Sequence, residues 1–312
     1  MGKIAFVFPG QGSQAVGMGK DACDRVDASR ERFEQADAAL GFALSQIVFE
    51  GPEEELKKTY HTQPALLTTS IALFEAFRAA GVQPDYVAGH SLGEYSALVV
   101  AGVLGFEDAV RTVRLRGEYM EQAVPGGRGA MAATLGADRG QLTALCADIS
   151  ASVGVVEPAN LNCPGQIVVS GSKEGVAALA ERGKEAGAKR VIPLEVSGPF
   201  HSSLMKPAAE RLAAALAEVA MQPAVVPVVA NVTAETVQDP AVVRDLLVRQ
   251  VYSPVLWEDS IAALIALGVD TFIEIGSGTV LAGLIRKIDK SVNVVSINSM
   301  AAVDAYLAGG QA

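Results

Sequence analysis

A serine between two glycines, Gly89-x-Ser91-x-Gly93, is the pattern in this sequence best suited to covalent chemistry. The apolar run before it is typical of a strand, and the Ala-, Leu- and Val-rich run after it is typical of a helix. A sharp strand-to-helix turn of this kind, a nucleophile elbow, exposes the serine hydroxyl at the edge of a sheet. The free amides of the following helix would favour an oxyanion on an acyl group attached there. We therefore predict that Ser91 is a nucleophile; the alternative for so short a motif is a surface turn.

A serine nucleophile needs a base within hydrogen-bond reach, and the chain has three histidines. His90 is the neighbour of Ser91, so its side chain leaves the elbow in another direction. His61 stands just ahead of a long apolar run, where a histidine is usually a surface or capping residue. By elimination His201, in a Gly-Pro loop that enters a helix, is the better candidate base. The alternative for His201 is a helix cap.

A glycine loop, Pro9-Gly10-Gln11-Gly12-Ser13-Gln14, follows the first apolar strand. It lacks the third glycine of a dinucleotide fingerprint and the Lys-Ser/Thr pair of a P-loop. Two interpretations stay open: a tight turn between strand and helix, or a loop that supplies a second backbone amide to an oxyanion hole.

Three arginines occur in the predicted helix 106–124: Arg111, Arg114 and Arg116. Several arginines on one amphipathic helix usually form a solvated face. Arg111 and Arg114 share a face, whereas Arg116 points elsewhere. If one of the three turns inward, we expect it to be Arg116.

These residues need a scaffold, and the alternation of apolar and helical runs predicts an α/β fold with a mostly parallel sheet covered on both faces. Residues 126–197 change rhythm to βαββαβ, the pattern of a small ferredoxin-like unit. We therefore expect a large catalytic domain, 1–125 and 198–312, with a hydrolase-like nucleophile elbow and an inserted small subdomain at 126–197. Further expected elements are a polar helical region at 29–60, helices at 62–80 and 254–267, and a strand at 225–230.

Composition limits the function classes. The net charge of -10 and the pI near 4.9 argue against nucleic acid and against an anionic membrane surface as partners. The sequence has no apolar run long enough to span a bilayer and no leader pattern. Cys23, Cys146 and Cys163 are odd in number and lack metal or redox spacing, so we expect reduced thiols, no metal site and a cytoplasmic protein.

Several spaced motifs together resemble the malonyl-CoA:acyl carrier protein transacylases of type II fatty acid synthesis or of polyketide pathways. The resemblance covers essentially the whole chain and rests on Gly10-Gln11-Gly12-Ser13-Gln14, Thr62-Gln63-Pro64-Ala65-Leu66, Gly89-His90-Ser91-Leu92-Gly93-Glu94, Arg116, Asn160 to Gly165, Gly198-Pro199-Phe200-His201-Ser202, Gln250 and Glu274-Ile275-Gly276. The sequence departs from the family at Gly276-Ser277-Gly278, where Gly-Pro-Gly is expected, and at His61, where a neutral polar residue is frequent.

The resemblance implies a ping-pong transfer of malonyl from malonyl-CoA to the phosphopantetheine thiol of an acyl carrier protein, with an ester on Ser91 between the two steps. His201 would be the general base and acid, oriented by the backbone carbonyl of Gln250 rather than by a carboxylate. The resemblance further implies backbone amides of an oxyanion hole, a carboxylate-binding arginine and neighbouring substrate-binding residues: Gln11 and Leu92; Arg116; Gln63, His90, Asn162 and Phe200. Phe200 would favour malonyl over methylmalonyl, or be a core aromatic residue. No bound cofactor is expected besides the coenzyme A thioester substrate, and a monomer is expected.

The carrier protein is itself acidic, so we expect a local basic patch near the mouth of the cleft, with Lys189 and Arg190 as candidates. Two other function classes stay open. A serine hydrolase would use the same Ser91 and His201 but would want a carboxylate partner and access for water. A non-catalytic binding module would keep the fold with Ser91 as a turn residue.

Overall fold

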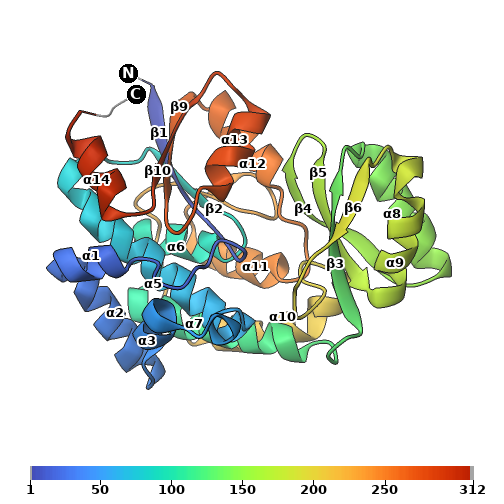
Figure 1. The fold of residues 1–312 in the computed structure, drawn as a ribbon, viewed down its shortest axis with the longest axis horizontal. Coiled ribbons are helices and arrows are strands. Elements are labelled where there is room, and N and C mark those ends of the chain that lie inside the picture. The colour runs from blue at the N-terminus through green and yellow to red at the C-terminus, as the bar shows by residue number, and fades with distance from the viewer. Residues whose placement is uncertain (1, 310–312) are drawn as a thin grey trace.

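A six-stranded sheet forms the centre of the larger part of the molecule, in a computed structural model that describes residues 2–309 (Figure 1). Its strands, in spatial order, are β10 (Asn293–Ile297), β9 (Val269–Ile275), β1 (Lys3–Phe8), β2 (Tyr86–Gly89), β7 (Val228–Val229) and β8 (Thr236–Val237). All neighbours pair in parallel except β7 and β8. The predicted α/β fold with a mostly parallel sheet is confirmed.

Helices cover both faces of this sheet, so β1 is apolar on both faces from Ile4 to Phe8. Successive side chains of a strand point to opposite faces. Phe6 and Phe8 accordingly lie in the larger core, while Ala5 and Val7 lie in a second core. The larger core is packed mainly by α1 (Lys20–Arg25), α2 (Asp27–Leu40), α3 (Leu44–Glu50), α4 (Glu53–Leu56), α5 (Thr59–Phe77), α6 (Gly93–Val100), α7 (Phe106–Gln122), α10 (Lys206–Ala217), α11 (Pro240–Gln250) and α14 (Met300–Leu307), and the second by α12 (Trp257–Ala266) and α13 (Val280–Ile288).

A separate antiparallel sheet lies beside the first, at the right of Figure 1. Its elements follow the predicted order βαββαβ: β3 (Gly129–Leu135), α8 (Arg139–Ser152), β4 (Val156–Cys163), β5 (Gln166–Ser172), α9 (Lys173–Arg182) with the short helix η2 (Gly183–Ala186), and β6 (Arg190–Pro193). The strands lie in the order β4-β5-β3-β6. The limits 126–197 of an inserted subdomain stay a prediction.

The boundaries of some elements differ from the prediction. The region 29–60 forms separate helices, and the strand expected at 225–230 is reduced to the two residues of β7. The helix expected at 254–267 begins only at Trp257. Helix α5 begins at Thr59, so His61 lies inside the helix and not ahead of it.

Pro64 lies inside α5 and explains why the start of this helix is hard to predict. Proline has no N–H to donate to the carbonyl four residues earlier, which here belongs to Tyr60. Arg114 Nη1 on α7 donates to that carbonyl instead, at 3.1 Å. A contact between two helices therefore compensates for a bond that the local sequence cannot make.

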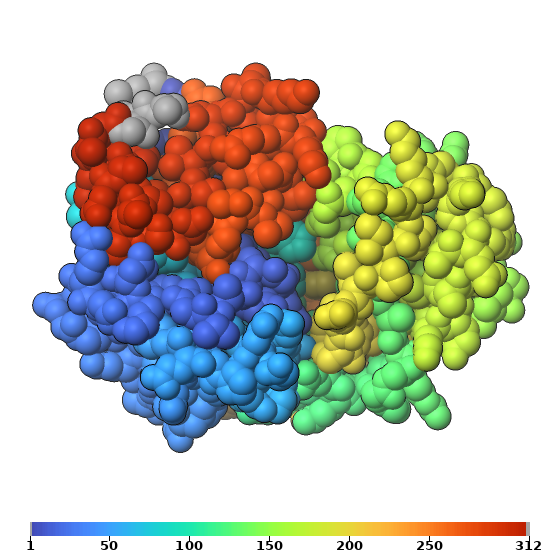
Figure 2. All heavy atoms as spheres, in the orientation of Figure 1, coloured from blue at the N-terminus to red at the C-terminus, as the bar shows by residue number. Residues whose placement is uncertain are grey.

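The surface is hollowed where the second sheet meets the larger part of the molecule (Figure 2). The loop after β1, the start of α13 and residues of β4 and β5 in the second sheet line a recess there. Across residues 2–309, none of the helices combines the length and the apolar character that a membrane span requires.

Candidate active site

The turn between β2 and α6 holds Ser91 in a conformation that side chains rarely adopt, with φ of 51°. The two flanking glycines are required by close backbone contacts. A Cβ at Gly89 would lie 1.9 Å from the carbonyl oxygen of Gly93, and a Cβ at Gly93 would lie 2.0 Å from that of Phe8. Unfavourable backbone conformations of this kind cluster at functional sites, where they hold a reactive group in place. The nucleophile elbow is therefore present as the sequence predicts.

His201 lies against Ser91, with Nε2 2.7 Å from the serine Oγ. The other ring nitrogen, Nδ1, donates to the backbone carbonyl of Gln250 at 2.8 Å. That bond fixes the tautomer in which Nε2 is free to accept the serine proton. His201 also has a positive φ of 58°. The two residues come from segments 110 positions apart and form the geometry of a nucleophile and its base.

The environment keeps His201 neutral. Its side chain is buried, and burial lowers the pKa of His201 to about 3, with a further contribution from the positive charge of Arg116. A neutral imidazole is the form that can take a proton from a hydroxyl.

Arg116 is the one arginine of helix α7 that turns inward, as expected: it is only 1% exposed. Its Nη1 donates to Gln63 Oε1 at 2.8 Å, and its Nη2 donates to Gln250 Oε1 at 2.9 Å and to Ser91 Oγ at 3.2 Å. Arg111, in contrast, pairs with acidic residues of its own helix at the surface. A buried guanidinium therefore lies beside the nucleophile.

A cavity opens over these groups. It is lined by Gln11, His90, Ser91, Leu92, Arg116, Met120, Met131, Asn160, Leu194, Val196, Phe200 and His201 and has a volume of about 110 Å³. A second cavity, of about 200 Å³, shares Gln11, His90, Asn160 and Leu194 with it and continues toward α13. The first cavity has room for a short acyl group, and the second has room for a longer chain attached to that group.

Gln11 and Leu92 stand at the carboxyl ends of the adjacent parallel strands β1 and β2. Within residues 2–309 no protein group accepts a hydrogen bond from the backbone N–H of either residue. Two backbone N–H groups that have no hydrogen-bond partner and lie beside a nucleophile are available to bind an oxyanion.

Of the remaining predicted site residues, Phe200 and His90 line the cavity at Ser91, whereas Gln63 and Asn162 do not. Gln63 contacts two residues that do line it: its Oε1 accepts from Arg116 Nη1, and its Nε2 donates to Met120 Sδ at 3.6 Å. His90 turns away from the serine, and its Nε2 lies 2.8 Å from Asn162 Oδ1. His61, which we did not expect to be catalytic, instead bonds the carbonyl of Glu55.

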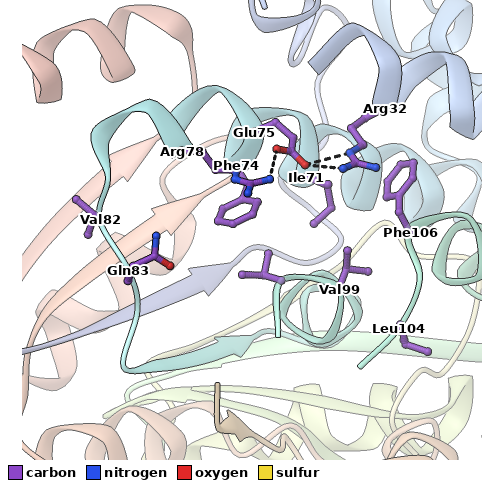
Figure 3. A pocket seen from close by; sticks show the side chains of 11 residues that line it. Arg32, Ile71, Phe74, Glu75, Arg78, Val82, Gln83, Val99, Leu104 and Phe106 are labelled. Carbon is purple, nitrogen blue, oxygen red and sulfur yellow. Dashed lines mark hydrogen bonds and ion pairs between the residues drawn. The ribbon is translucent and has the colours of Figure 1, made fainter. Parts of the chain in front are cut away.

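Another cavity, of about 410 Å³, lies between α5, α6 and the start of α7 and shares no residue with the one at Ser91 (Figure 3). Figure 3 shows that Glu75 accepts hydrogen bonds from both Arg32 and Arg78 there. No nucleophile and base meet in it. The described part of the chain contains no cluster of three or more His, Cys, Asp or Glu side chains that could hold a metal ion.

The family model described as "Acyl transferase domain" matches residues 5–305. The chain belongs to the acyl transferase domain family. As a member of this acyl transferase family, it is 54% identical over 298 residues to the malonyl CoA-acyl carrier protein transacylase of Bacillus subtilis (strain 168), covering 96% of this chain and 94% of the relative.

Solved structures of similar chains agree with the fold of this acyl transferase. The crystal structure of an acyl carrier protein S-malonyltransferase from Vibrio cholerae superposes with a TM-score of 0.94 at 46% identity, covering 97% of this chain and 99% of that one. A malonyl-transacylase in complex with its type II PKS acyl-carrier protein gives a TM-score of 0.95 at 42% identity, covering 99% and 100%.

Two buried polar residues of this acyl transferase were not predicted. Asn231 Oδ1 accepts from the Ser91 backbone N–H at 2.7 Å, and its Nδ2 donates to the Gly89 carbonyl at 2.7 Å. Glu94 accepts from the Asn231 backbone N–H and from Gln250 Nε2. Glu94 belongs to a sequence motif already noted, whereas the sequence contains no signal that brings Asn231 to the elbow.

Proposed function

We propose that this protein transfers a malonyl group from malonyl-CoA to the phosphopantetheine thiol of an acyl carrier protein, through a malonyl ester on Ser91. The product would supply extender units for fatty acid or polyketide synthesis. The malonyl-CoA:acyl carrier protein relatives support this substrate pair.

The choice of malonyl as the transferred acyl group rests on one observation. Arg116 is buried beside Ser91, and its hydrogen-bond partners are neutral amide and hydroxyl oxygens. A guanidinium matches a carboxylate bidentately and is costly to leave unpaired in a dry site. An acyl group that ends in a carboxylate would pair with this charge, whereas an acetyl group would leave it unpaired.

In the first half-reaction, His201 Nε2 takes the proton of Ser91 Oγ as the oxygen attacks the thioester carbonyl. The oxyanion is held by the backbone N–H groups of Gln11 and Leu92. When the carbon–sulfur bond breaks, coenzyme A leaves as the thiol with the proton from His201. Arg116 holds the malonyl carboxylate through the step.

The second half-reaction reverses these roles. The carrier-protein thiol gives its proton to His201 and attacks the ester carbonyl at the same oxyanion hole. The ester bond breaks, the proton returns to Ser91 Oγ, and malonyl leaves as a carrier-protein thioester. The backbone carbonyl of Gln250 holds the imidazole in the required tautomer in both directions.

The test is intact-protein mass spectrometry after mixing with malonyl-CoA, with Ser91→Ala as the control. We expect a malonyl adduct on the parent protein only, and its loss when phosphopantetheinylated carrier protein is added. An adduct that water removes as fast as the carrier protein does would indicate a hydrolase. An adduct that forms equally on Ser91→Ala, or no adduct at all, would contradict the proposal.

Three further proposals accompany this function. Lys189 and Arg190 are exposed where β6 begins, and we propose them as part of the basic surface that meets the carrier protein. Unchanged carrier-protein affinity after reversal of both charges would contradict it. The three cysteines are free, which supports a reducing compartment such as the cytoplasm. We also propose a monomer, which sedimentation of the protein would test.

A further inference from the structure

A buried carboxyl group lies three residues after the nucleophile and has no part in the steps above. Glu94 stands in the first turn of α6 and is only 2% exposed. Its Oε2 accepts from Gln250 Nε2 at 2.7 Å and from the Asn231 backbone N–H at 3.2 Å. A buried acidic residue is normally paired with a cation or hydrogen-bonded, and Glu94 is held by neutral donors.

The amide of Gln250 has an acceptor side and a donor side, and its surroundings fix which way it points. Nε2 faces Glu94 Oε2, the Ser91 carbonyl at 3.0 Å and Asn231 Oδ1 at 3.4 Å. Oε1 accepts from Arg116 Nη2 at 2.9 Å. The reversed amide would place an NH₂ group against the guanidinium, which is repulsive whatever the protonation state of Glu94, and an oxygen against Glu94 Oε2, which is repulsive when that oxygen carries no proton.

The hydrogen bonds of Arg116 show why this orientation matters. A guanidinium has five N–H groups. In the described structure one is held by Gln63, one by Gln250 and one points to Ser91 Oγ, while the buried Nε has no partner. The two amide oxygens therefore fix the plane of the guanidinium, and Nη2, which points to Ser91 Oγ, is directed at the acyl site.

We propose that Glu94 is a positioning residue for acyl-group selectivity. By accepting from Gln250 Nε2, it turns Gln250 Oε1 toward Arg116 and so aims the guanidinium at the carboxylate of an acyl group on Ser91. This role rests on the proposed malonyl transfer and adds a selectivity residue that never touches the substrate.

The function of Glu94 depends on its acceptor oxygen and not on its charge. Burial raises the pKa of Glu94 to about 7, against the hydrogen bonds from Gln250 and Asn231 and, to a smaller extent, the positive charge of Arg116. In the protonated form the hydrogen can reside on Oε1, which leaves Oε2 to accept the same two bonds. Glutamine at this position keeps an acceptor oxygen, aspartate withdraws it by one methylene group, and methionine removes it.

The test is the ratio of kcat/KM for malonyl-CoA to kcat/KM for acetyl-CoA in Glu94→Gln, Glu94→Asp and Glu94→Met. We expect Glu94→Gln to keep the parent ratio. Glu94→Asp should lower it several-fold, and Glu94→Met should lower it by roughly 10- to 100-fold, the loss expected when a charge-assisted contact is misplaced by about 1 Å. The fall should come from malonyl transfer, because acetyl has no carboxylate to misalign.

A matched control is Glu75→Met, which removes another largely buried carboxyl group at the remote cavity of Figure 3. It should change stability and leave the ratio at the parent value. A double-mutant cycle tests the route: in a Gln250→Met background, which keeps the backbone carbonyl, Glu94→Asp should lower the ratio no further.

Two outcomes would overturn the proposal. One is a parent-like ratio in folded Glu94→Asp and Glu94→Met; the aspartate variant alone decides the matter where the methionine variant does not fold. The other is equal loss of malonyl and acetyl transfer in all three variants, which is the result of a purely structural role. Failure of the parent protein to accept malonyl at all would instead count against the proposed function.

Discussion

Two arginine sites in this molecule differ in the side chains that pair with the guanidinium groups. Arg32 and Arg78 share the carboxylate of Glu75, whose side chain is 7% exposed, at the remote cavity. Arg116 is more deeply buried, yet within residues 2–309 it forms no ion pair and is held by the side-chain oxygens of Gln63, Gln250 and Ser91. An arginine with a carboxylate partner stabilises the fold. An arginine oriented by neutral amides keeps its charge for an anion that arrives later.

The two sites should differ most in activity when each arginine is replaced by alanine. Arg116→Ala should lower kcat/KM for malonyl transfer by roughly 10³- to 10⁴-fold, because the carboxylate then enters a buried site without its partner. Acetyl transfer should fall much less. Arg32→Ala should leave both reactions at parent rates. Initial rates with malonyl-CoA and acetyl-CoA check this, and equal losses for the two substrates in Arg116→Ala would remove the argument for selectivity.

Arg116→Lys separates charge from shape. Lysine keeps the positive charge but lacks the planar fork that bonds Gln63, Gln250 and a carboxylate together. We expect malonyl transfer to fall by roughly 10- to 100-fold, the equivalent of one charge-assisted hydrogen bond. Steady-state kinetics with malonyl-CoA measure it. Parent kinetics in Arg116→Lys would show that charge alone is sufficient.

The charge on Arg116 should also be visible in the pH profile. Burial first, and Arg116 second, lower the pKa of His201 to about 3, so the base stays neutral in mildly acidic solution. Removing the charge should raise that pKa. The acid limb of kcat/KM for acetyl transfer should therefore lie at higher pH in Arg116→Ala than in the parent. Identical acid limbs would mean that burial alone controls His201.

The lowered pKa of His201 also predicts that the stability of the folded protein depends on pH. Unfolded His201 has an ordinary pKa of about 6.5, so below that pH the unfolded chain binds a proton that the folded protein excludes. Stability is lost as the pH falls from about 6.5 toward 3. At about pH 5 the cost is roughly 2 kcal/mol relative to neutral pH. Urea unfolding of the parent and of His201→Gln at both pH values measures it, and the parent should lose more stability on acidification.

The sequence predicted the geometry of the candidate site best where the residues involved are adjacent in the chain. The elbow is one continuous stretch, and its glycines, strand and helix are adjacent in the chain, so Ser91 could be predicted directly. The inward turn of Arg116 followed from its place on the helix. His201 was reached by elimination, because the chain has only three histidines.

What sequence could not predict depends on contacts between distant segments. Asn231 lies 140 positions from Ser91 and clamps its backbone through a side chain that looks like any loop asparagine. The early start of α5 depends on Arg114, which takes the place of the missing proline bond. The short strand β7 pairs with β2 over two residues only, so the sheet defines it more than its own pattern does.

The smallest expected effect lies at the remote arginine site. Glu75→Gln keeps the shape of the side chain but removes the charge that Arg32 and Arg78 share. Because Arg78 is largely exposed and Arg32 only partly buried, we expect the free energy of unfolding to fall by about 1 kcal/mol, and less at high salt. Both acyl-transfer reactions should be unchanged. Urea unfolding at low and high salt, with acyl-transfer rates alongside, measures both. A loss of malonyl selectivity in this variant would mean that the two arginine sites are coupled and that a carboxylate partner does not confine an arginine to a structural role.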